Sequence, residues 1–196
     1  MITEDKMFEQ LTEENVLGVY KKPNISYFEP KQSLYSKSAI KKIAEWVAEK
    51  LEFSVGGSIE SIVKKIGGEL VFLGPSNIMQ VGDEQLGAIL IHEQFKFQIF
   101  IPNYTLEFRD RFTIAHELGH YFLHYIFTDE RKPLIAARGV SNKVEAEANH
   151  FAACFLMPED EFRNDYSKMN LSQLSSKYQV SKLAINVRAS YLGIQL

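Results

Sequence analysis

The spacing of apolar residues predicts two helices in the first third of the chain. From Ser38 onward, apolar side chains recur every three or four positions, which places them on one helical face. A shorter helix is expected at 59–66, followed by a strand at 69–73. Residues 1–36 show only weak periodicity, so we expect an extension that either drapes over the domain or stays mobile.

An alternating pattern predicts a β-hairpin near the middle of the chain. The run FKFQIFI (95–101) places phenylalanine and isoleucine at alternate positions with lysine and glutamine between them, and only Phe100 interrupts the polar face. Together with 86–91 it predicts two paired strands that turn at 92–94. Pro102 ends the second strand, because proline has no amide hydrogen to donate to the ladder.

Helical patterns return in the second half of the chain. One helix is expected from about 105 to 125, and a second from Ser141, a candidate N-cap, to just before Pro158. Two short helical patterns follow at 171–178 and 181–192. This order predicts an α+β fold with a small antiparallel sheet packed on the 105–125 helix. The expected organisation is an extension (1–36), a main domain (37–165) and a helix-turn-helix-like C-terminal segment (166–196).

Composition narrows the class of protein. Apolar residues make up 45 % and charged residues 24 % of the 196 residues, which is ordinary for a globular domain. A net charge of −3 argues against binding nucleic acid with the whole surface. No apolar run approaches the length of a membrane span, and the polar N-terminus does not resemble a secretory signal. With Cys154 as the single cysteine, a cytoplasmic location is expected.

The sequence TIAHELGHYFLHY (113–125) contains an H-E-x-x-H motif formed by His116, Glu117 and His120. Residues four apart lie one turn above each other on a helix, so the two imidazoles can bind one metal ion. The glutamate can then take a proton from a water molecule on that ion. The plainer interpretation is a surface helix with histidines that are solvated or satisfied by hydrogen bonds within the protein. His124 repeats the spacing, and a hydrogen-bonded structural role is expected for it.

A catalytic zinc site normally has three protein ligands, so one more is needed. The natural source is the next predicted helix, SNKVEAEANHFAACFLMP (141–158). Glu145 and Glu147 border opposite sides of its apolar stripe, and His150 lies one turn beyond Glu147. Periodicity leaves these three candidates open.

The two motifs RFTIAHELGHYFLH (111–124) and EAEANHFAACFLMP (145–158) together resemble the ImmA/IrrE family of zinc metallopeptidases. The resemblance implies a zincin-like domain that binds Zn²⁺ through His116, His120 and Glu147, with Glu117 as the general base. Glu145 then becomes a helix-start carboxylate or a group that orients a histidine. Asn149 belongs to the same motif and is expected either to form a hydrogen bond near the ligand-bearing turn or to cap and pack the helix.

The resemblance also implies a function. The chain is expected to be a zinc-dependent endopeptidase that cleaves a regulatory protein, such as a helix-turn-helix repressor or an antitoxin of a mobile element or stress response. The alternative is a regulatory binding protein in which the zinc fold is a scaffold and the tail binds DNA or a repressor. After Asp165 the chain has four basic residues and no acidic one, a formal charge of +4 that could contact phosphates. These residues are Lys168, Lys177, Lys182 and Arg188.

Overall fold

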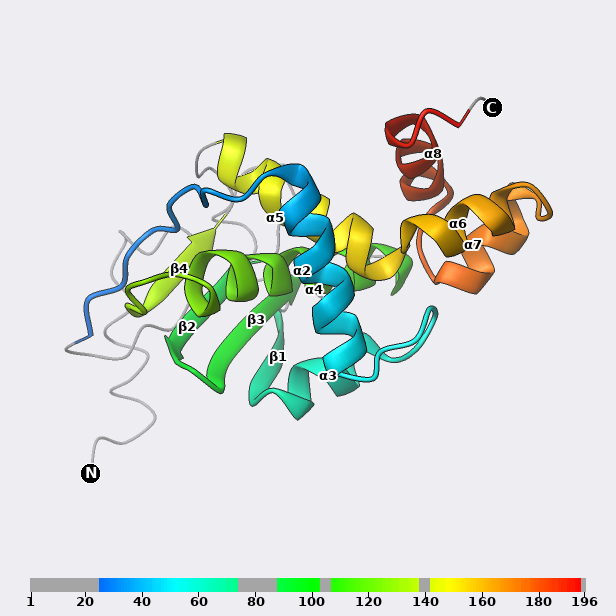
Figure 1. The fold of residues 1–196 in the computed structure, drawn as a ribbon. Coiled ribbons are helices and arrows are strands. Elements are labelled where there is room, and N and C mark those ends of the chain that lie inside the picture. The colour runs from blue at the N-terminus through cyan, green and yellow to red at the C-terminus, as the bar shows by residue number, and fades with distance from the viewer. Residues whose placement is uncertain (1–24, 74–87, 103–106, 138–141, 195–196) are drawn as a thin grey trace.

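The computed structural model describes residues 25–73, 88–102, 107–137 and 142–194 (Figure 1). It confirms the α+β class, with helices packed on a four-stranded sheet. The predicted N-cap Ser141 lies outside the described residues. In chain order the elements are α2 (Lys37–Lys50), α3 (Ile59–Lys65), β1 (Gly68–Leu73), β2 (Ala88–Glu93), β3 (Lys96–Pro102), α4 (Glu107–Tyr121), η2 (Phe122–Ile126), β4 (Leu134–Ala137), α5 (Asn142–Leu156), α6 (Glu159–Tyr166), α7 (Leu171–Tyr178) and α8 (Lys182–Tyr191).

The sheet has the strand order β1-β3-β2-β4 and is mixed. β2 pairs antiparallel with both β3 and β4, whereas β1 runs parallel to β3. The prediction of a purely antiparallel sheet was therefore wrong at β1. The reason is that β1 does not pair with β2, the next strand along the chain, but with β3, which the hairpin has turned back into the direction of β1.

The β2–β3 hairpin is confirmed, but its turn lies later than predicted. The turn is at Gln94 and Phe95, and Phe95 has a backbone φ of 63°. That conformation is uncommon for residues other than glycine and aims the side chain out of the strand face. Phe95 is therefore 62 % exposed, whereas the pattern had placed it on the inner face of the strand.

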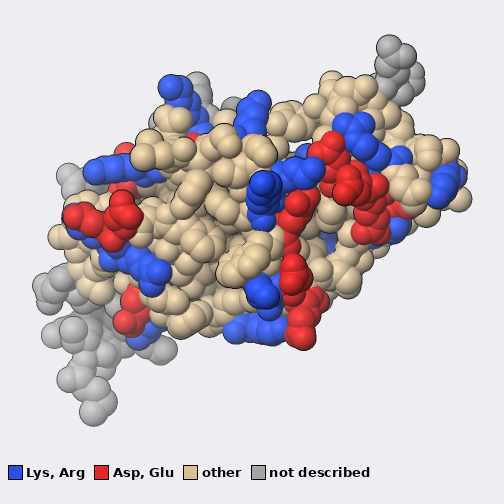
Figure 2. Space-filling model, viewed as in Figure 1, with Lys and Arg blue, Asp and Glu red and all other residues tan. Residues whose placement is uncertain are grey.

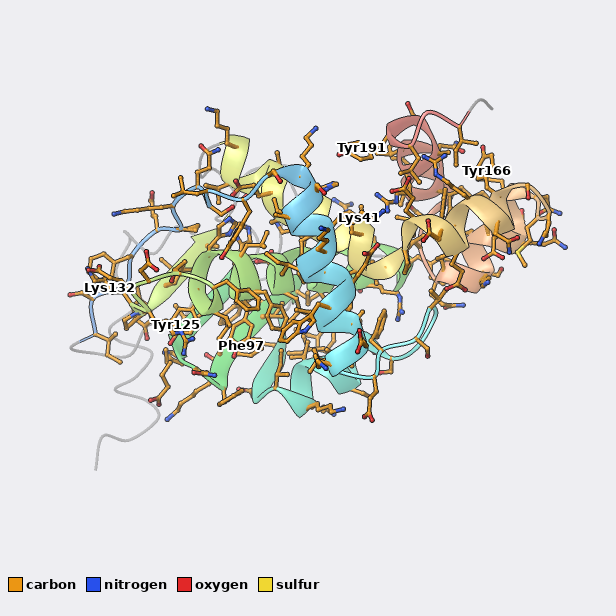
Figure 3. The ribbon with its side chains drawn as sticks, in the orientation of Figure 1. Lys41, Phe97, Tyr125, Lys132, Tyr166 and Tyr191 are labelled. Carbon is orange, nitrogen blue, oxygen red and sulfur yellow. The ribbon has the colours of Figure 1, made fainter. Side chains whose placement is uncertain are left out.

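Both faces of the hairpin are covered. On one face, Phe97 and Ile99 are buried in the main core, and the ring of Phe97 lies 4.3 Å from the ring of Tyr121 on α4. Figure 3 shows Phe97 and Tyr125 between the sheet and the helical layer. On the other face, Phe100 is buried in a smaller cluster against which Tyr27 packs. The phenylalanine that interrupts the polar face of β3 is thus accommodated by the N-terminal segment.

The helical layer is built around α5, which packs against both α2 and α4. The contact between α4 and α5 is very close at Gly119. A Cβ atom added there would lie 2.9 Å from the Cα atom of Ala148, closer than packed side chains tolerate. The glycine inside the motif thus permits the close approach of helix α5.

The N-terminal segment from residue 25 drapes over the edge of the sheet. The amide of Phe28 donates to the carbonyl of Pro133, and the amide of Ile135 donates to the carbonyl of Phe28. These bonds form a parallel bridge between Phe28 and Leu134 on β4, the edge strand. Of the two alternatives for the extension, the described part thus takes the draped one.

The end of the η2 helix is held by two N-terminal contacts. The hydroxyl of Tyr35 donates to the carbonyl of Phe127, the residue directly after η2, over 3.0 Å. The ring of Trp46 on α2 packs edge-on against the ring of Phe127, with 6.1 Å between the centroids. Trp46 is half exposed. The helix that carries the H-E-x-x-H motif is therefore fixed at its far end.

The C-terminal helices α6, α7 and α8 extend from one end of the molecule (Figure 1). Helices α7 and α8 follow the predicted patterns, whereas α6 was not predicted. A capping box between Asn170 and Gln173 starts α7, and the Ser181 side chain caps α8. Between them, Gln179 adopts a left-handed conformation that makes the connection tight. Buried side chains of α7 and α8 belong to the same hydrophobic core as those of α2, α4 and α5.

Candidate metal centre

The three motif residues are buried. His116 is 0 %, Glu117 2 % and His120 1 % exposed on α4, whose last turn continues into the π-helical turn η2. Leu118 and Leu123 are fully buried around them and anchor the helix. Burial therefore excludes solvated histidines on a surface helix, and it is compatible with histidines that are satisfied by contacts within the protein. Burying three ionisable groups together is costly unless they pair with one another or with a metal ion.

The imidazoles of His116 and His120 converge with the carboxylate of Glu145. Their Nε2 atoms lie 3.2 Å apart. The Oε2 atom of Glu145 lies 3.3 Å from Nε2 of His116, and its Oε1 atom lies 3.4 Å from Nε2 of His120. One ligand atom from each of the three residues falls within 4.8 Å of the others. The structure therefore brings together two nitrogens and a carboxylate.

Glu147, the third ligand that the resemblance implied, lies elsewhere. Its Oε2 atom is 3.0 Å from Nε2 of His124 and accepts a hydrogen bond from the amide of Ser33 over 2.9 Å. Two residues apart on a helix are rotated by about 200°, so Glu145 and Glu147 cannot face the same point. His150, the third candidate, points away, with Nε2 3.0 Å from the carbonyl of Lys37. Of the three candidate ligands, all of which lie in the described part of the chain, only Glu145 approaches both motif histidines.

Each motif histidine has a partner on its other nitrogen. Nδ1 of His116 lies 2.9 Å from Oδ1 of Asn149, and Nδ1 of His120 lies 3.0 Å from Nδ1 of His124. The expectation of a hydrogen bond at Asn149 near the ligand-bearing turn is confirmed. The contact between His120 and His124 was missed, although the repeated four-residue spacing of the three histidines carries that signal.

The acid–base properties of the cluster follow from burial and from mutual contact. Burial lowers the pKa of His120 to about 4, against the opposing effect of its contact with Glu145. Burial also lowers the pKa of His124. For Glu145, burial acts to raise the pKa, but the contacts with His116 and His120 outweigh it and bring the pKa far below its ordinary value. Burial thus favours the neutral imidazole of His120 and His124, and the contacts with the histidines favour the ionised carboxylate of Glu145; these are the states in which such groups bind a metal.

The residues fit a zinc ion. Imidazole nitrogen and carboxylate oxygen are ordinary zinc ligands, and three protein ligands are the number found in catalytic zinc sites. The Oε1 atom of Glu145 is buried and has no hydrogen-bond partner among the described residues. A buried oxygen of this kind carries a desolvation cost that a cation would remove.

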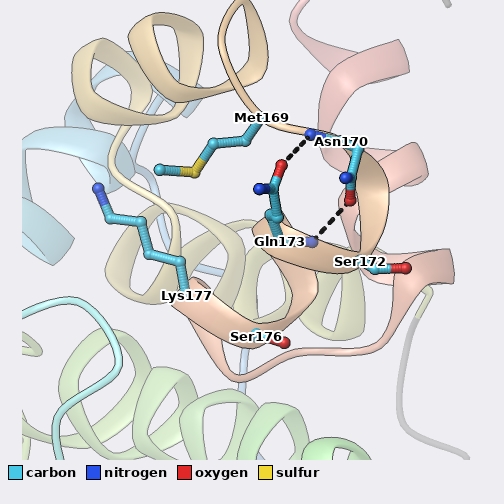
Figure 4. A pocket seen from close by; sticks show the side chains of 6 residues that line it. All are labelled: Met169, Asn170, Ser172, Gln173, Ser176 and Lys177. Atoms are coloured by element: carbon cyan, nitrogen blue, oxygen red, sulfur yellow. Dashed lines mark hydrogen bonds between the residues drawn. The ribbon is translucent and has the colours of Figure 1, made fainter.

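A hollow of about 500 Å³ lies away from this cluster, on the surface of α7 (Figure 4). Its polar groups already serve the helix: the amide of Asn170 donates to Oε1 of Gln173, and the amide of Gln173 donates to Oδ1 of Asn170. The hollow therefore offers no chemistry comparable to that of the histidine cluster. Its lining residues are Met169, Asn170, Ser172, Gln173, Ser176 and Lys177.

The basic C-terminal segment is less available than its formal charge indicates. Lys177 forms ion pairs with Glu161 and Asp165. Arg188 is 2 % exposed and donates from Nε and Nη2 to the carbonyl of Met157, at the end of α5. On the face shown in Figure 2, basic and acidic side chains are interleaved. Lys168 donates to Oδ1 of Asn164. Three of the four basic residues are thus engaged in contacts within the chain.

Comparison with known families adds an independent finding. The model of the family Peptidase_M78, described as the IrrE N-terminal-like domain, matches residues 78–190, which is more than half of the chain. The matched range includes both motifs and the three converging side chains. No match was found among curated proteins. Separately, none of the helices in the described residues combines the length and apolarity that crossing a bilayer requires.

Proposed function

The chain belongs to the M78 family of metallopeptidases, and from this premise we propose that it is a zinc-dependent endopeptidase with His116, His120 and Glu145 as its metal ligands. The observation that carries the proposal is the convergence of two Nε2 atoms and one carboxylate, with Glu117 on the same helix turn. It confirms the expected resemblance to the ImmA/IrrE family. It also supports Glu145, in place of Glu147, as the third ligand of our proposal.

The reaction divides among the residues as follows. A zinc ion at this site, when bound, supplies a Lewis acid that makes water a better nucleophile at neutral pH and polarises a peptide carbonyl. Glu117, 2 % exposed, is the general base: its carboxylate takes the proton of the attacking water and passes it to the leaving amine as the C–N bond breaks. His116 and His120 are both buried and direct Nε2 toward the proposed metal position, and the burial that lowers the pKa of His120 favours its neutral, metal-binding form.

The proposed substrate is a regulatory protein, such as a helix-turn-helix repressor or an antitoxin. The support for this class is the resemblance carried by the two sequence motifs. The family match supports a protein substrate in general. We do not propose DNA binding, because Lys177 and Arg188 are engaged within the chain and no contact in the described residues favours it.

The ligand assignment is tested by metal content. Purified wild-type protein, Glu145→Gln and Glu147→Gln are dialysed against zinc, and zinc is measured by mass spectrometry. We expect about one zinc per wild-type chain, a loss in Glu145→Gln, and retention in Glu147→Gln. Loss in Glu147→Gln with retention in Glu145→Gln would restore the assignment that the resemblance implied.

The catalytic role of Glu117 is tested by cleavage of a candidate substrate. Purified helix-turn-helix repressors and antitoxins are each incubated with wild-type protein and with Glu117→Gln, with zinc or with chelator. Removing a general base is expected to lower the rate by about 10²–10⁴-fold, while zinc content stays unchanged. Equal cleavage by the variant, or cleavage that persists in chelator, would contradict the mechanism.

A further inference from the structure

A continuous chain of polar contacts runs outward from His120. Nδ1 of His120 lies 3.0 Å from Nδ1 of His124, and Nε2 of His124 lies 3.0 Å from Oε2 of Glu147. The same oxygen accepts a hydrogen bond from the amide of Ser33 over 2.9 Å. His120 and His124 are 1 % and 5 % exposed, and Glu147 is 9 % exposed. The contacts from His120 to Glu147 are thus shielded from water, and the last contact, with Ser33, is partly buried.

Binding of a metal by Nε2 of His120 would fix which ring nitrogen carries the hydrogen in both His120 and His124. If Nε2 of His120 is the metal ligand, its ring hydrogen must be on Nδ1, which makes Nδ1 a donor. Nδ1 of His124 must then be the acceptor, so the hydrogen of His124 is on Nε2. That nitrogen donates to the carboxylate of Glu147, which can only accept. No other neutral arrangement satisfies both contacts.

From this geometry we infer that His124 and Glu147 are positioning residues that hold His120 in its metal-binding tautomer and orientation. The inference rests on the proposed function and deepens it. A carboxylate at the end of such a chain makes the imidazole a stronger ligand, because it stabilises the partial positive charge that the ring acquires on binding a cation. Glu147 therefore acts on the metal through two imidazoles rather than by direct contact.

The two motif histidines are supported differently. His116 has a neutral amide behind it, with Oδ1 of Asn149 at 2.9 Å from Nδ1. His120 has a second imidazole and a charged carboxylate. The amide of Ser33 also ties the carboxylate to the N-terminal segment, 114 positions away in the chain. Of the three histidines spaced four residues apart, His116 and His120 thus face the proposed metal position, and His124 supports His120.

The test is zinc affinity measured by competition with a chromogenic chelator. His124→Leu removes both nitrogens, and we expect the dissociation constant to rise about 10–100-fold. His124→Gln retains an acceptor and a donor, so it should recover most of that loss. His150→Leu is the matched control, since His150 is a half-buried histidine on α5 outside the chain of contacts, and its zinc affinity should equal that of the wild type. Equal affinity of His124→Leu and wild type would overturn the inference.

A second measurement needs no substitution. Nitrogen NMR of the zinc-loaded wild-type protein distinguishes protonated from unprotonated ring nitrogens. We expect His124 to carry its hydrogen on Nε2 and to have a bare Nδ1. The opposite tautomer would overturn the inference even if the leucine variant failed to fold. A wild-type protein that binds no zinc would instead contradict the proposed function, so the two failures are distinguishable.

Discussion

The helix pair α4–α5 and the C-terminal helices α6–α8 both bury charged side chains, but the two regions differ in how completely these side chains are hydrogen-bonded. In the C-terminal helices, Asp165 accepts hydrogen bonds from Lys177 and from the hydroxyl of Tyr178. Arg188 donates two hydrogen bonds to the carbonyl of Met157. In the α4–α5 pair, by contrast, one carboxylate oxygen of Glu145 has no hydrogen-bond partner among the described residues.

The difference separates structural from ligand-binding polar groups. A buried charge that the protein fully pairs contributes to holding its helices together, and nothing remains for a ligand to do. A buried carboxylate oxygen that lies beside two imidazoles and has no hydrogen-bond partner among the described residues leaves free energy to be gained from a cation. By this criterion the C-terminal network is structural, and the histidine cluster fits the metal site that we propose. Four predictions test that distinction, from the largest expected effect to the smallest.

Zinc should stabilise the protein through the α4–α5 site alone. At a free zinc concentration about 1,000 times the dissociation constant, a ligand that binds only the folded state adds about 4 kcal/mol to the free energy of unfolding. We expect this gain in urea titrations of the wild type and of Asp165→Asn. Glu145→Gln should gain far less, and an equal gain in Glu145→Gln would place the metal elsewhere.

Acid should destabilise the two regions in different pH windows. The pKa of His120 is about 4 in the folded metal-free protein and near 6.5 when unfolded, so the unfolded chain binds more protons between these values. Stability from this group is complete above pH 6.5 and falls as the pH drops toward 4, by on the order of 3 kcal/mol. Metal-free protein measured by urea unfolding at several pH values should show this decline.

The side-chain carboxylate of Asp165, in the C-terminal helices, titrates at a lower pH than His120. Burial acts to raise the pKa of Asp165, but hydrogen bonds from Lys177 and Tyr178 outweigh it, so the folded pKa lies below the unfolded value of 3.8. Its contribution is present above pH 3.8 and is lost only on further acidification. Asp165→Asn should therefore leave the decline in stability between pH 6.5 and 4 unchanged. If the decline vanished in this variant, it would come from the C-terminal helices and not from His120.

Removing the charge of Asp165 should cost stability without touching the metal site. Asp165→Asn leaves Lys177 and Tyr178 with a weaker acceptor, and we expect a loss of about 2 kcal/mol, since hydrogen bonds to charged groups contribute about 1.5–3 kcal/mol. Lys177 is about a third exposed, which keeps the loss moderate. Chelator competition should give the wild-type zinc affinity. A fall in affinity would show that the two regions are coupled.

The smallest effect, on DNA binding, is expected from the two exposed lysines of the C-terminal segment, Lys168 and Lys182. Lys182→Glu reverses a charge on α8, and Lys168→Glu reverses one after α6. If the segment does not bind DNA, neither variant should change retention in gel-shift assays at low salt, because the wild type should not be retained either. Salt-dependent retention of the wild type that these variants abolish would support the DNA-binding alternative.

Periodicity in the sequence was sufficient for most helices. Helices α7 and α8 and the hairpin follow from local spacing and turn residues, because their signals lie within a few residues of one another. Strand β4 and helix α6 were missed. β4 is only four residues long and is defined by its pairing with β2 and with Phe28, contacts that local sequence does not encode.

The third ligand shows the same limit at the site. A helical projection places Glu145 and Glu147 on either side of the apolar stripe of α5 and cannot say which side faces α4. That choice depends on how the helices cross, which is set by the contact of Gly119 with Ala148. The H-E-x-x-H motif was readable because its spacing lies within one helix. The series of hydrogen-bonded contacts from His120 to Ser33 could not be predicted, because it joins segments that are distant in sequence.

The packing of Trp46 against Phe127 has a practical consequence. Trp46 is the single tryptophan of the chain, and its ring is in contact with the residue that follows η2, one turn beyond His124. Its half-exposed indole makes its emission sensitive to small changes in local polarity. The protein therefore carries a built-in optical reporter at the end of its histidine helix, and the rate at which metal enters or leaves can be followed in stopped-flow fluorescence without attaching a dye.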